Sequence, residues 1–192
     1  MSDLPAIAHR PGAVQRSGDA PGVGFAVAQR TAIDGLIDHA RGYAESVHRG
    51  GLPKVPTKRL AVVTCMDARI NLATLLGLGD ADAHVIRNAG AVISDGELRS
   101  LAMSQRLLHT TEIAVVLHTD CGARAVVDAD FRAALAAETG IRPSWGPLAF
   151  GEVEDDVRAN VRRILDDPFI PHKQQVRGFV FDVETGVLTE VV

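Results

Sequence analysis

Three short apolar runs constrain the fold of this chain more than any other feature of its sequence. They are Leu60–Thr64, Ala83–Ile86 and Ile113–Leu117, and β-branched residues are frequent in them. Runs of this length and composition are typical of strands that are buried on both faces of a parallel sheet. The sequence therefore predicts a sheet whose strands follow one another at intervals long enough to hold helices.

Helical periodicity lies around and between these runs. Apolar residues recur at steps of mostly three and four in the first of the predicted helices. The second begins with a capping box, because Glu97 follows Ser94 by three residues. The last has acidic residues in its first turn and basic residues in its last. The four helices are predicted over residues 26–49, 94–108, 130–138 (ended by Gly140) and 152–165.

The end of the chain reads as a hairpin at the edge of the sheet. A strand over Phe179–Val183 is followed by the turn Glu184–Gly186 and a last strand over Val187–Val192. The fold class expected is α/β, with a mainly parallel β-sheet, an antiparallel edge strand, flanking helices and an N-terminal helical arm. Residues 1–25 contain three prolines and four glycines and are expected to form a flexible arm before a single domain over 26–192.

Composition limits the partners and the compartment. The 192 residues suit one domain, and 46% hydrophobic with 23% charged residues is ordinary for a soluble protein. The 20 basic and 24 acidic residues give a net charge of −4, which argues against nucleic acid as a partner. No apolar run approaches the roughly 20 residues that cross a bilayer, so no membrane is expected. The N-terminal residues lack a signal-peptide pattern, and a cytoplasmic location is expected.

Only two cysteines, Cys65 and Cys121, occur in the chain, which argues against a disulfide framework. Cys65 directly follows the first apolar run, and His118 and Cys121 follow the third. Ligands bind at the carboxyl ends of strands in such sheets, and two thiolates with one imidazole are a ligand set that Zn²⁺ favours. The three residues are expected to bind zinc and to leave its fourth position open to water, as catalytic zinc sites do.

Asp67 and Arg69 follow Cys65 closely and are the candidate catalytic pair. Asp67 could reach the zinc as a fourth ligand, or it could accept a hydrogen bond from a zinc-bound hydroxide. The planar fork of Arg69 suits a bidentate grip on a carboxylate. We hypothesise a gate in which Arg69, by holding Asp67, keeps the metal open to water. Because two thiolates weaken the metal as a Lewis acid, activity should rise toward alkaline pH.

Each motif also has a structural interpretation. The two cysteines could be inert buried thiols, and Asp67 with Arg69 could be a structural ion pair. Gly90, after the second run, would let the backbone approach the metal pocket, or it could simply be part of a turn before a helix. The zinc interpretation is favoured because both cysteines of the chain fall in these motifs, each directly after a predicted strand.

The segments CMDARI (65–70), HVIRNAG (84–90) and HTDCG (118–122), in this order and spacing, resemble the β-class carbonic anhydrases. The resemblance runs from about residue 27 to the C-terminus, includes RPSWGPLAF and RGFVFDVETG, and is closest to the compact branch typified by archaeal and actinobacterial members. It implies zinc held by Cys65, His118 and Cys121, with Asp67 and Arg69 as the catalytic dyad.

The resemblance also implies an activity and an assembly. The reaction is the reversible hydration of CO₂, in which zinc hydroxide attacks the carbon, bicarbonate leaves and a proton passes to buffer. Gly90 and Gly122 are expected to line the substrate site. The assembly is expected to be a homodimer, or a homotetramer built from dimers, in which the N-terminal helix embraces the partner.

One stretch departs from the family pattern. After Cys121, where relatives carry bulky apolar residues, this chain has Ala123, Arg124 and Val126. The change could widen the pocket, alter the dimer seam or place a charge near the entrance. Two alternatives to CO₂ hydration therefore stay open: hydrolysis of carbonyl sulfide or carbon disulfide with the same zinc set, and a non-catalytic member that binds zinc or bicarbonate.

Overall fold

The computed structural model describes residues 30–46, 50–146 and 151–192. By its contacts the chain divides into two compact units, one up to His48 and one from Arg49 onward. The described part of the first unit is helix α1, Ala32–Ser46. Its first turn is capped by Thr31 and Asp34, whose side chains and backbone N–H groups bond reciprocally. The flexible arm predicted over 1–25 lies outside the described residues, as do both ends of the helix predicted over 26–49.

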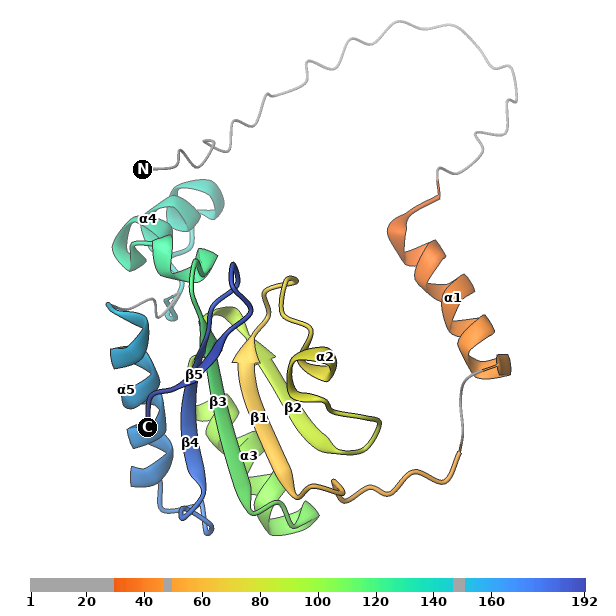
Figure 1. Cartoon of the computed structure of the whole chain (residues 1–192). Coiled ribbons are helices and arrows are strands. Elements are labelled where there is room, and N and C mark those ends of the chain that lie inside the picture. The colour runs from red at the N-terminus through yellow and green to blue at the C-terminus, as the bar shows by residue number, and fades with distance from the viewer. Residues whose placement is uncertain (1–29, 47–49, 147–150) are drawn as a thin grey trace, which may run out of the picture. The chain divides into compact units, whose positions relative to one another are not determined.

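The second unit is built on one five-stranded sheet (Figure 1). In spatial order the strands are β2-β1-β3-β4-β5. The pairs β2·β1, β1·β3 and β3·β4 are parallel and β4·β5 is antiparallel, so the fold class predicted from sequence is confirmed. The strand bounds are β1 Leu60–Cys65, β2 Ala83–Asn88, β3 Glu112–His118, β4 Val176–Phe181 and β5 Leu188–Glu190.

Helices α3, Asp95–Leu108, and α5, Val153–Asp166, lie beside each other on the sheet. An ion pair between Arg163 and Asp95 joins them at 2.8 Å. Helix α3 buries Leu101 against the apolar side chains of the middle strands, and α5 buries Val157, Val161 and Ile164 there. The core is therefore aliphatic. Its close packing fixes β1 and β3, and the candidate site lies at the carboxyl ends of these two strands.

The shorter elements were harder to predict. Helix α2, Leu72–Leu76, was not predicted, because five residues are too few to show a helical period. Its boundaries come from capping: the Asn71 side chain accepts a hydrogen bond from the Thr74 N–H, and Gly77 ends the helix in the left-handed region. Two 3₁₀ turns, η1 Ala89–Ala91 and η2 Gly122–Ala125, follow β2 and β3.

Helices α3, α4 and α5 match their predictions within about two residues, whereas α1 starts at Ala32, several residues after its predicted start at 26. Ser94 forms the predicted capping box with Glu97 at the start of α3. Gly140 ends α4, Asp128–Thr139, as predicted. None of the helices in the described ranges has the length and apolar character that crossing a membrane requires.

The predicted boundaries of the last hairpin were wrong. Strand β4 starts at Val176 and stops at Phe181, before the predicted end at Val183. It stops there because the Asp182 carboxylate accepts hydrogen bonds from the N–H groups of Glu184 and Thr185 and so begins the turn. Strand β5 is correspondingly shorter than the predicted 187–192.

Candidate metal centre

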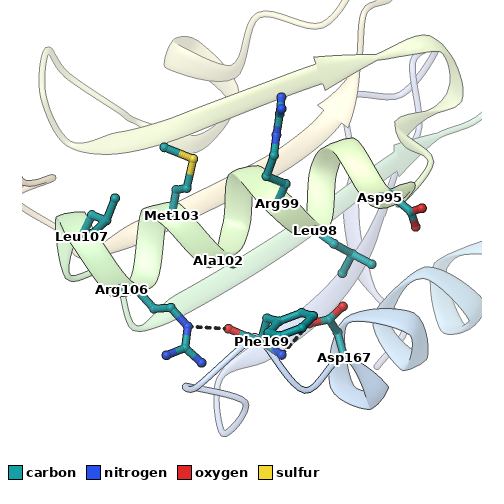
Figure 2. Close-up of a pocket in the computed structure, with 9 residues that line it drawn as sticks. All are labelled: Asp95, Leu98, Arg99, Ala102, Met103, Arg106, Leu107, Asp167 and Phe169. Carbon is teal, nitrogen blue, oxygen red and sulfur yellow. Dashed lines mark hydrogen bonds between the residues drawn. The ribbon is translucent and has the colours of Figure 1, made fainter.

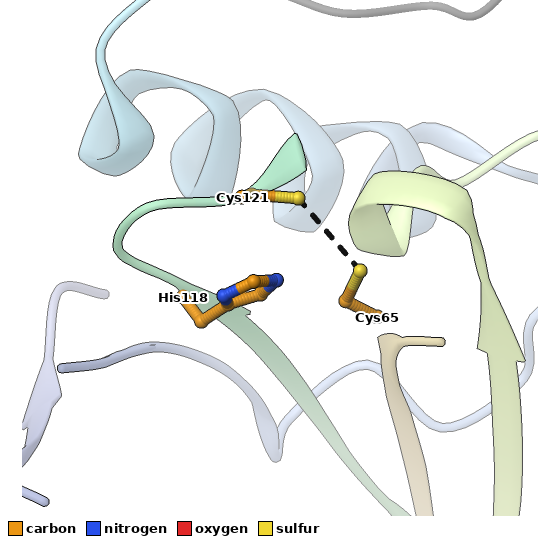
Figure 3. A group of neighbouring side chains, drawn as sticks. All are labelled: Cys65, His118 and Cys121. Atoms are coloured by element: carbon orange, nitrogen blue, oxygen red, sulfur yellow. Dashed lines mark hydrogen bonds between the residues drawn. The ribbon is translucent and has the colours of Figure 1, made fainter. Parts of the chain in front are cut away.

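The two cysteines and His118 meet at the carboxyl edge of the sheet (Figure 3). Cys65 is the last residue of β1, His118 is the last residue of β3, and Cys121 follows in the next turn. All three are buried, and their potential ligand atoms lie within 4.8 Å of one another. The Sγ atoms of Cys65 and Cys121 are 3.8 Å apart. The structure thus brings together the three residues that the sequence singled out.

His118 presents one ring nitrogen without a partner. Its side chain is 1% exposed. Its Nδ1 lies 2.8 Å from the Thr119 carbonyl oxygen, an acceptor, so Nδ1 carries the proton and donates it. Nε2 is then a buried lone pair with no hydrogen-bond partner in the described part of the chain. A buried acceptor without a partner, beside two thiols, is an arrangement that a bound cation would satisfy.

The pKa shifts of Cys121 and His118 favour the neutral form of each side chain in the absence of a cation. Burial, together with the neighbouring Cys65, raises the pKa of the Cys121 thiol. Burial also lowers the pKa of His118, so its imidazole stays neutral and can act as a ligand. Two sulfurs and one imidazole nitrogen in a closed, buried triangle fit zinc. Zinc is therefore the metal whose chemistry agrees with the donor set, and these three residues would hold it.

Asp67 lies beside this set and is held by Arg69. The Arg69 guanidinium donates Nε to Oδ1 of Asp67 at 3.0 Å and Nη2 to Oδ2 at 2.8 Å. The expected bidentate grip is thus present. Oδ2 of Asp67 is also 3.9 Å from the free Nε2 of His118. Hydrogen bonds from the Arg69 side chain and backbone hold the pKa of the Asp67 carboxyl well below its usual range, so this carboxylate faces the set ionised.

Asp120 is a second carboxylate on Arg69 that the sequence analysis did not single out. Its Oδ2 accepts a hydrogen bond from Arg69 Nη1 at 2.7 Å, and its backbone oxygen accepts one from Nη2 at 2.8 Å. The hydrogen bonds from Arg69 to Asp67 and Asp120 raise the pKa of the guanidinium. Arg69 and Asp120 are 51 positions apart, so only the parallel pairing of β1 with β3 brings them together.

The backbone of η1 approaches the metal site at Gly90, as the sequence predicted. Gly90 has φ +78°, in the left-handed region that favours glycine, and its N–H points to Cys65 Sγ at 3.4 Å. Two asparagines brace this turn: Asn88 exchanges hydrogen bonds with Val92, and Asn160 of α5 bonds to Ala91 and Ile93. Hydrogen bonds to a ligand sulfur stabilise the thiolate. The assignment of Gly90 to substrate binding stays a prediction.

Arg87, in the RNAG segment, is a further residue whose part the sequence did not reveal. From β2 its guanidinium donates to three carbonyl oxygens of the turn after β1, those of Cys65, Asp67 and Ile70, at 2.9, 2.7 and 3.2 Å. It therefore fixes the backbone that carries Cys65 and Asp67. Because its partners are main-chain groups, no residue type at a given spacing could have indicated them.

In the divergent turn after Cys121, the charged side chain of Arg124 points toward α5. Arg124 forms an ion pair with Asp156 at 2.6 Å, and both side chains are largely buried. Burial raises the pKa of Asp156, and the Arg124 charge opposes that rise. The new charge is thus neutralised within the fold. No atom beyond its chain neighbours lies within 4 Å of a Cβ built on Gly122, so the space beside it is open; its substrate role is likewise still a prediction.

A separate groove runs along the outer side of α3 (Figure 2). Leu98, Met103, Leu107 and Phe169 give it an apolar lining, and Arg106 Nε donates to the Phe169 carbonyl oxygen. Neither cysteine nor His118 lines it. The candidate ligands lie instead at the strand ends.

Comparisons with known proteins point to one family. The carbonic anhydrase family profile matches residues 60–145. Beta-carbonic anhydrase 1 of Mycobacterium tuberculosis (strain ATCC 25618 / H37Rv) is 49% identical over 155 residues, which are 81% of this chain and 92% of that protein. The crystal structure of carbonic anhydrase from Streptococcus mutans superposes with a TM-score of 0.80 at 36% identity, covering 85% of this chain and 99% of that one. Carbon disulfide hydrolase of Acidianus sp. (strain A1-3) is 29% identical, covering 70% of this chain and 77% of that protein.

Proposed function

The chain belongs to the β-carbonic anhydrase family, and from this we propose that it catalyses the reversible hydration of CO₂ to bicarbonate and a proton with zinc at Cys65, His118 and Cys121. The observation that carries the proposal is the orphaned Nε2 of His118, enclosed with two thiols and beside an ionised carboxylate. A closed structural zinc site would need a fourth protein ligand and would have no use for the Asp67–Arg69 pair.

Zinc, when bound, would acidify a coordinated water and so supply the nucleophile at neutral pH. The residues of the chain orient the reacting groups. Arg69 keeps the Asp67 carboxylate ionised and turned toward the ligand set. Asp67 can then accept a hydrogen bond from the attacking water and so orient its lone pair toward the carbon of CO₂. The proton released passes to buffer.

Asp67 has a second possible role, as a fourth ligand that closes the site. In the arrangement seen here both of its oxygens are taken by Arg69, and Oδ2 lies 3.9 Å from His118 Nε2. We propose that this arrangement is the active one and that loss of the Arg69 contact frees Asp67 to ligate. Asp67 and Arg69 are thus assigned as the catalytic pair.

Stopped-flow measurement of CO₂ hydration by the zinc-loaded protein tests the function. Turnover is expected for the wild type and should vanish, together with bound zinc, in Cys65→Ser and His118→Ala. His109→Ala, which changes a histidine at the end of α3, is the matched control and should keep both. A zinc-loaded wild type with no CO₂ hydration would contradict the proposal.

The pH profile provides an independent test of the ligand set. Two thiolates neutralise more of the charge of a divalent cation than three neutral imidazoles do, so the nucleophile should ionise at a higher pH. CO₂ hydration should accordingly rise between pH 6 and pH 9. A flat profile over this range would contradict two-thiolate ligation with an open position.

Hydrolysis of carbon disulfide or carbonyl sulfide is the second candidate. It is favoured by the similarity to carbon disulfide hydrolase and by the divergent turn at Ala123 and Arg124. Both are linear triatomic molecules that the same nucleophile could attack. Parallel assays on CO₂, carbonyl sulfide and carbon disulfide with one zinc-loaded preparation separate the candidates, and zinc binding without turnover of any of them would indicate a non-catalytic binding protein.

We also propose that the chain assembles as a homodimer, or as a homotetramer built from dimers. Each unit leaves an apolar surface uncovered among its described residues: Ile33, Leu36 and Ile37 on α1, and a hollow on the sheet lined by Leu60, Leu76, Ala114, Phe179 and Leu188. Burial in a second copy would remove these surfaces from water.

A reducing cytoplasm is the proposed compartment, because both ligand cysteines must stay free of disulfide bonds.

A further inference from the structure

Arg69 is held from two sides, and only one of them belongs to the catalytic pair. Asp67 occupies Nε and one hydrogen of Nη2, while Asp120 occupies the other hydrogen of Nη2 and one of Nη1. Four of the five N–H donors of a guanidinium are thereby used. We propose that Asp120 is a positioning residue that holds Arg69 in the orientation in which it grips Asp67. This inference rests on the proposed function, since it concerns the same catalytic pair.

The turn that carries Asp120 is fixed without any help from Arg69. The neighbouring Thr119 donates its N–H to the Phe181 carbonyl oxygen at 3.0 Å, and its Oγ1 accepts a hydrogen bond from the Val183 N–H at 3.1 Å. On the other side, the Cys121 carbonyl oxygen accepts a hydrogen bond from the Arg124 N–H. Asp120 therefore sits on a backbone segment that is anchored on both sides, and its carboxylate, 77% exposed, reaches the 47% exposed side chain of Arg69. The anchored backbone of Asp120 gives Arg69 a fixed partner.

The backbone of Asp120 supports the same interpretation. Its φ is +51°, in the left-handed region that glycine adopts most readily and that aspartate adopts more often than most other residues. This conformation lets both the backbone oxygen and the carboxylate of one residue reach the same guanidinium. A glycine would adopt it more easily but would offer only the backbone oxygen. An aspartate therefore supplies the carboxylate contact to Arg69 that a glycine would lack.

The choice of substitutions separates positioning from a merely structural role. Asp120→Gly relieves the left-handed conformation and removes the carboxylate, and Asp120→Asn keeps that conformation and a neutral acceptor. If Asp120 only shaped the turn, Asp120→Gly would match or exceed the wild type in every measurement. Asp95→Asn is the matched control, because Asp95 pairs with Arg163 at 2.8 Å in an exposed ion pair on other elements.

The experiment follows the Arg69 Nε–H by nuclear magnetic resonance in the zinc-loaded full chain, with the signal assigned through Arg69→Lys. In Asp120→Gly the exchange of this proton with water should accelerate, and kcat for CO₂ hydration should fall about two- to fivefold, the range that exposed ion pairs support. The zinc content should stay at that of the wild type and Tm should hold or rise. Asp120→Asn should lie between, and Asp95→Asn should change neither proton exchange nor kcat.

Two results would overturn the inference. One is wild-type proton exchange and kcat in Asp120→Gly. The other is loss of zinc in both Asp120 variants, which would show that the residue shapes the ligand turn instead. The proposed function fails separately: faster exchange in Asp120→Gly with no CO₂ hydration by the wild type would keep the positioning role and remove the reaction.

Discussion

The protonation state of the ligand side chains decides how the site takes up a metal. In the metal-free protein, burial raises the pKa of the Cys121 thiol and lowers that of His118, so at neutral pH this thiol is protonated and the imidazole is neutral. A cysteine ligates as its thiolate, so its proton must leave when zinc binds. Zinc affinity should therefore fall as the pH is lowered.

Isothermal titration calorimetry in buffers of different ionisation enthalpy measures this proton release. Near pH 7 we expect about two protons per zinc, one per cysteine ligand. His118 contributes a lone pair and no proton, so it should add nothing to the release. Zinc uptake with no release of protons would contradict thiolate ligation.

Arg69 is the residue whose removal should separate metal binding from turnover. In Arg69→Ala the zinc ligands are intact, so zinc content should match the wild type, but Asp67 loses its bidentate partner. CO₂ hydration should fall about ten- to a hundredfold, as for other residues that orient a group beside a metal. Arg69→Lys keeps the charge without the planar fork and should recover only part of the rate. Full activity in Arg69→Ala would refute the gate.

At the scale of single residues, the sequence was sufficient where ligand chemistry and local spacing coincide. Cys65, His118 and Cys121 could be identified because each follows a strand that could be predicted from its apolar run. Asp120 and Arg87 could not, because their contacts are made across strands and largely to carbonyl oxygens. Such contacts depend on strand register, which no residue type encodes by itself.

Gly178 in β4 lies against helix α5 with no room for a side chain. A Cβ at this position would lie 2.3 Å from Val157 Cγ1 and 3.0 Å from Val161 Cγ2, both on α5. Gly178→Ala should therefore push α5 outward and lower the free energy of unfolding by about 1–3 kcal/mol. Urea denaturation followed by circular dichroism measures the change.

The control for this substitution is an alanine where space exists. Gly96→Ala lies in the first turn of α3, where the nearest atom to a new Cβ is the Ser94 Oγ at 3.5 Å. It should leave the stability unchanged or raise it slightly. If Gly178→Ala proved equally neutral, the packing of α5 against β4 would be looser than the structure shows.

Elements could be predicted where a repeating pattern is long enough to read. The strands β1 and β3 and the helices α3 and α5 have such patterns, and their predicted bounds were nearly right. Helix α2 and the end of β4 were set by single side-chain caps, those of Asn71 and Asp182. A capping side chain moves a boundary by one or two residues, and periodicity cannot detect it.

At the scale of the whole molecule, the exposed apolar face of α1 makes a prediction about assembly. Leu36 is 68% exposed, and Ile33 and Ile37 lie on the same side of the helix. Leu36→Glu would place a charge in the proposed dimer interface. Multi-angle light scattering should show the wild type at twice the mass of the chain or more, and Leu36→Glu at lower mass. Glu45→Lys, on the polar side of α1, should leave the assembly intact; a monomeric wild type would contradict the proposal.

The proximity of Cys65 and Cys121 also has a consequence for folding thermodynamics. The two thiols are 56 positions apart in the chain, yet their sulfurs are separated by 3.8 Å in the folded state. A cation held between them would link β1 to the turn after β3 only in the folded state, where the ligands meet. Because it would bind the native state alone, it would shift the folding equilibrium by mass action. The catalytic metal is therefore expected to stabilise the folded state in a chain whose two cysteines form no disulfide.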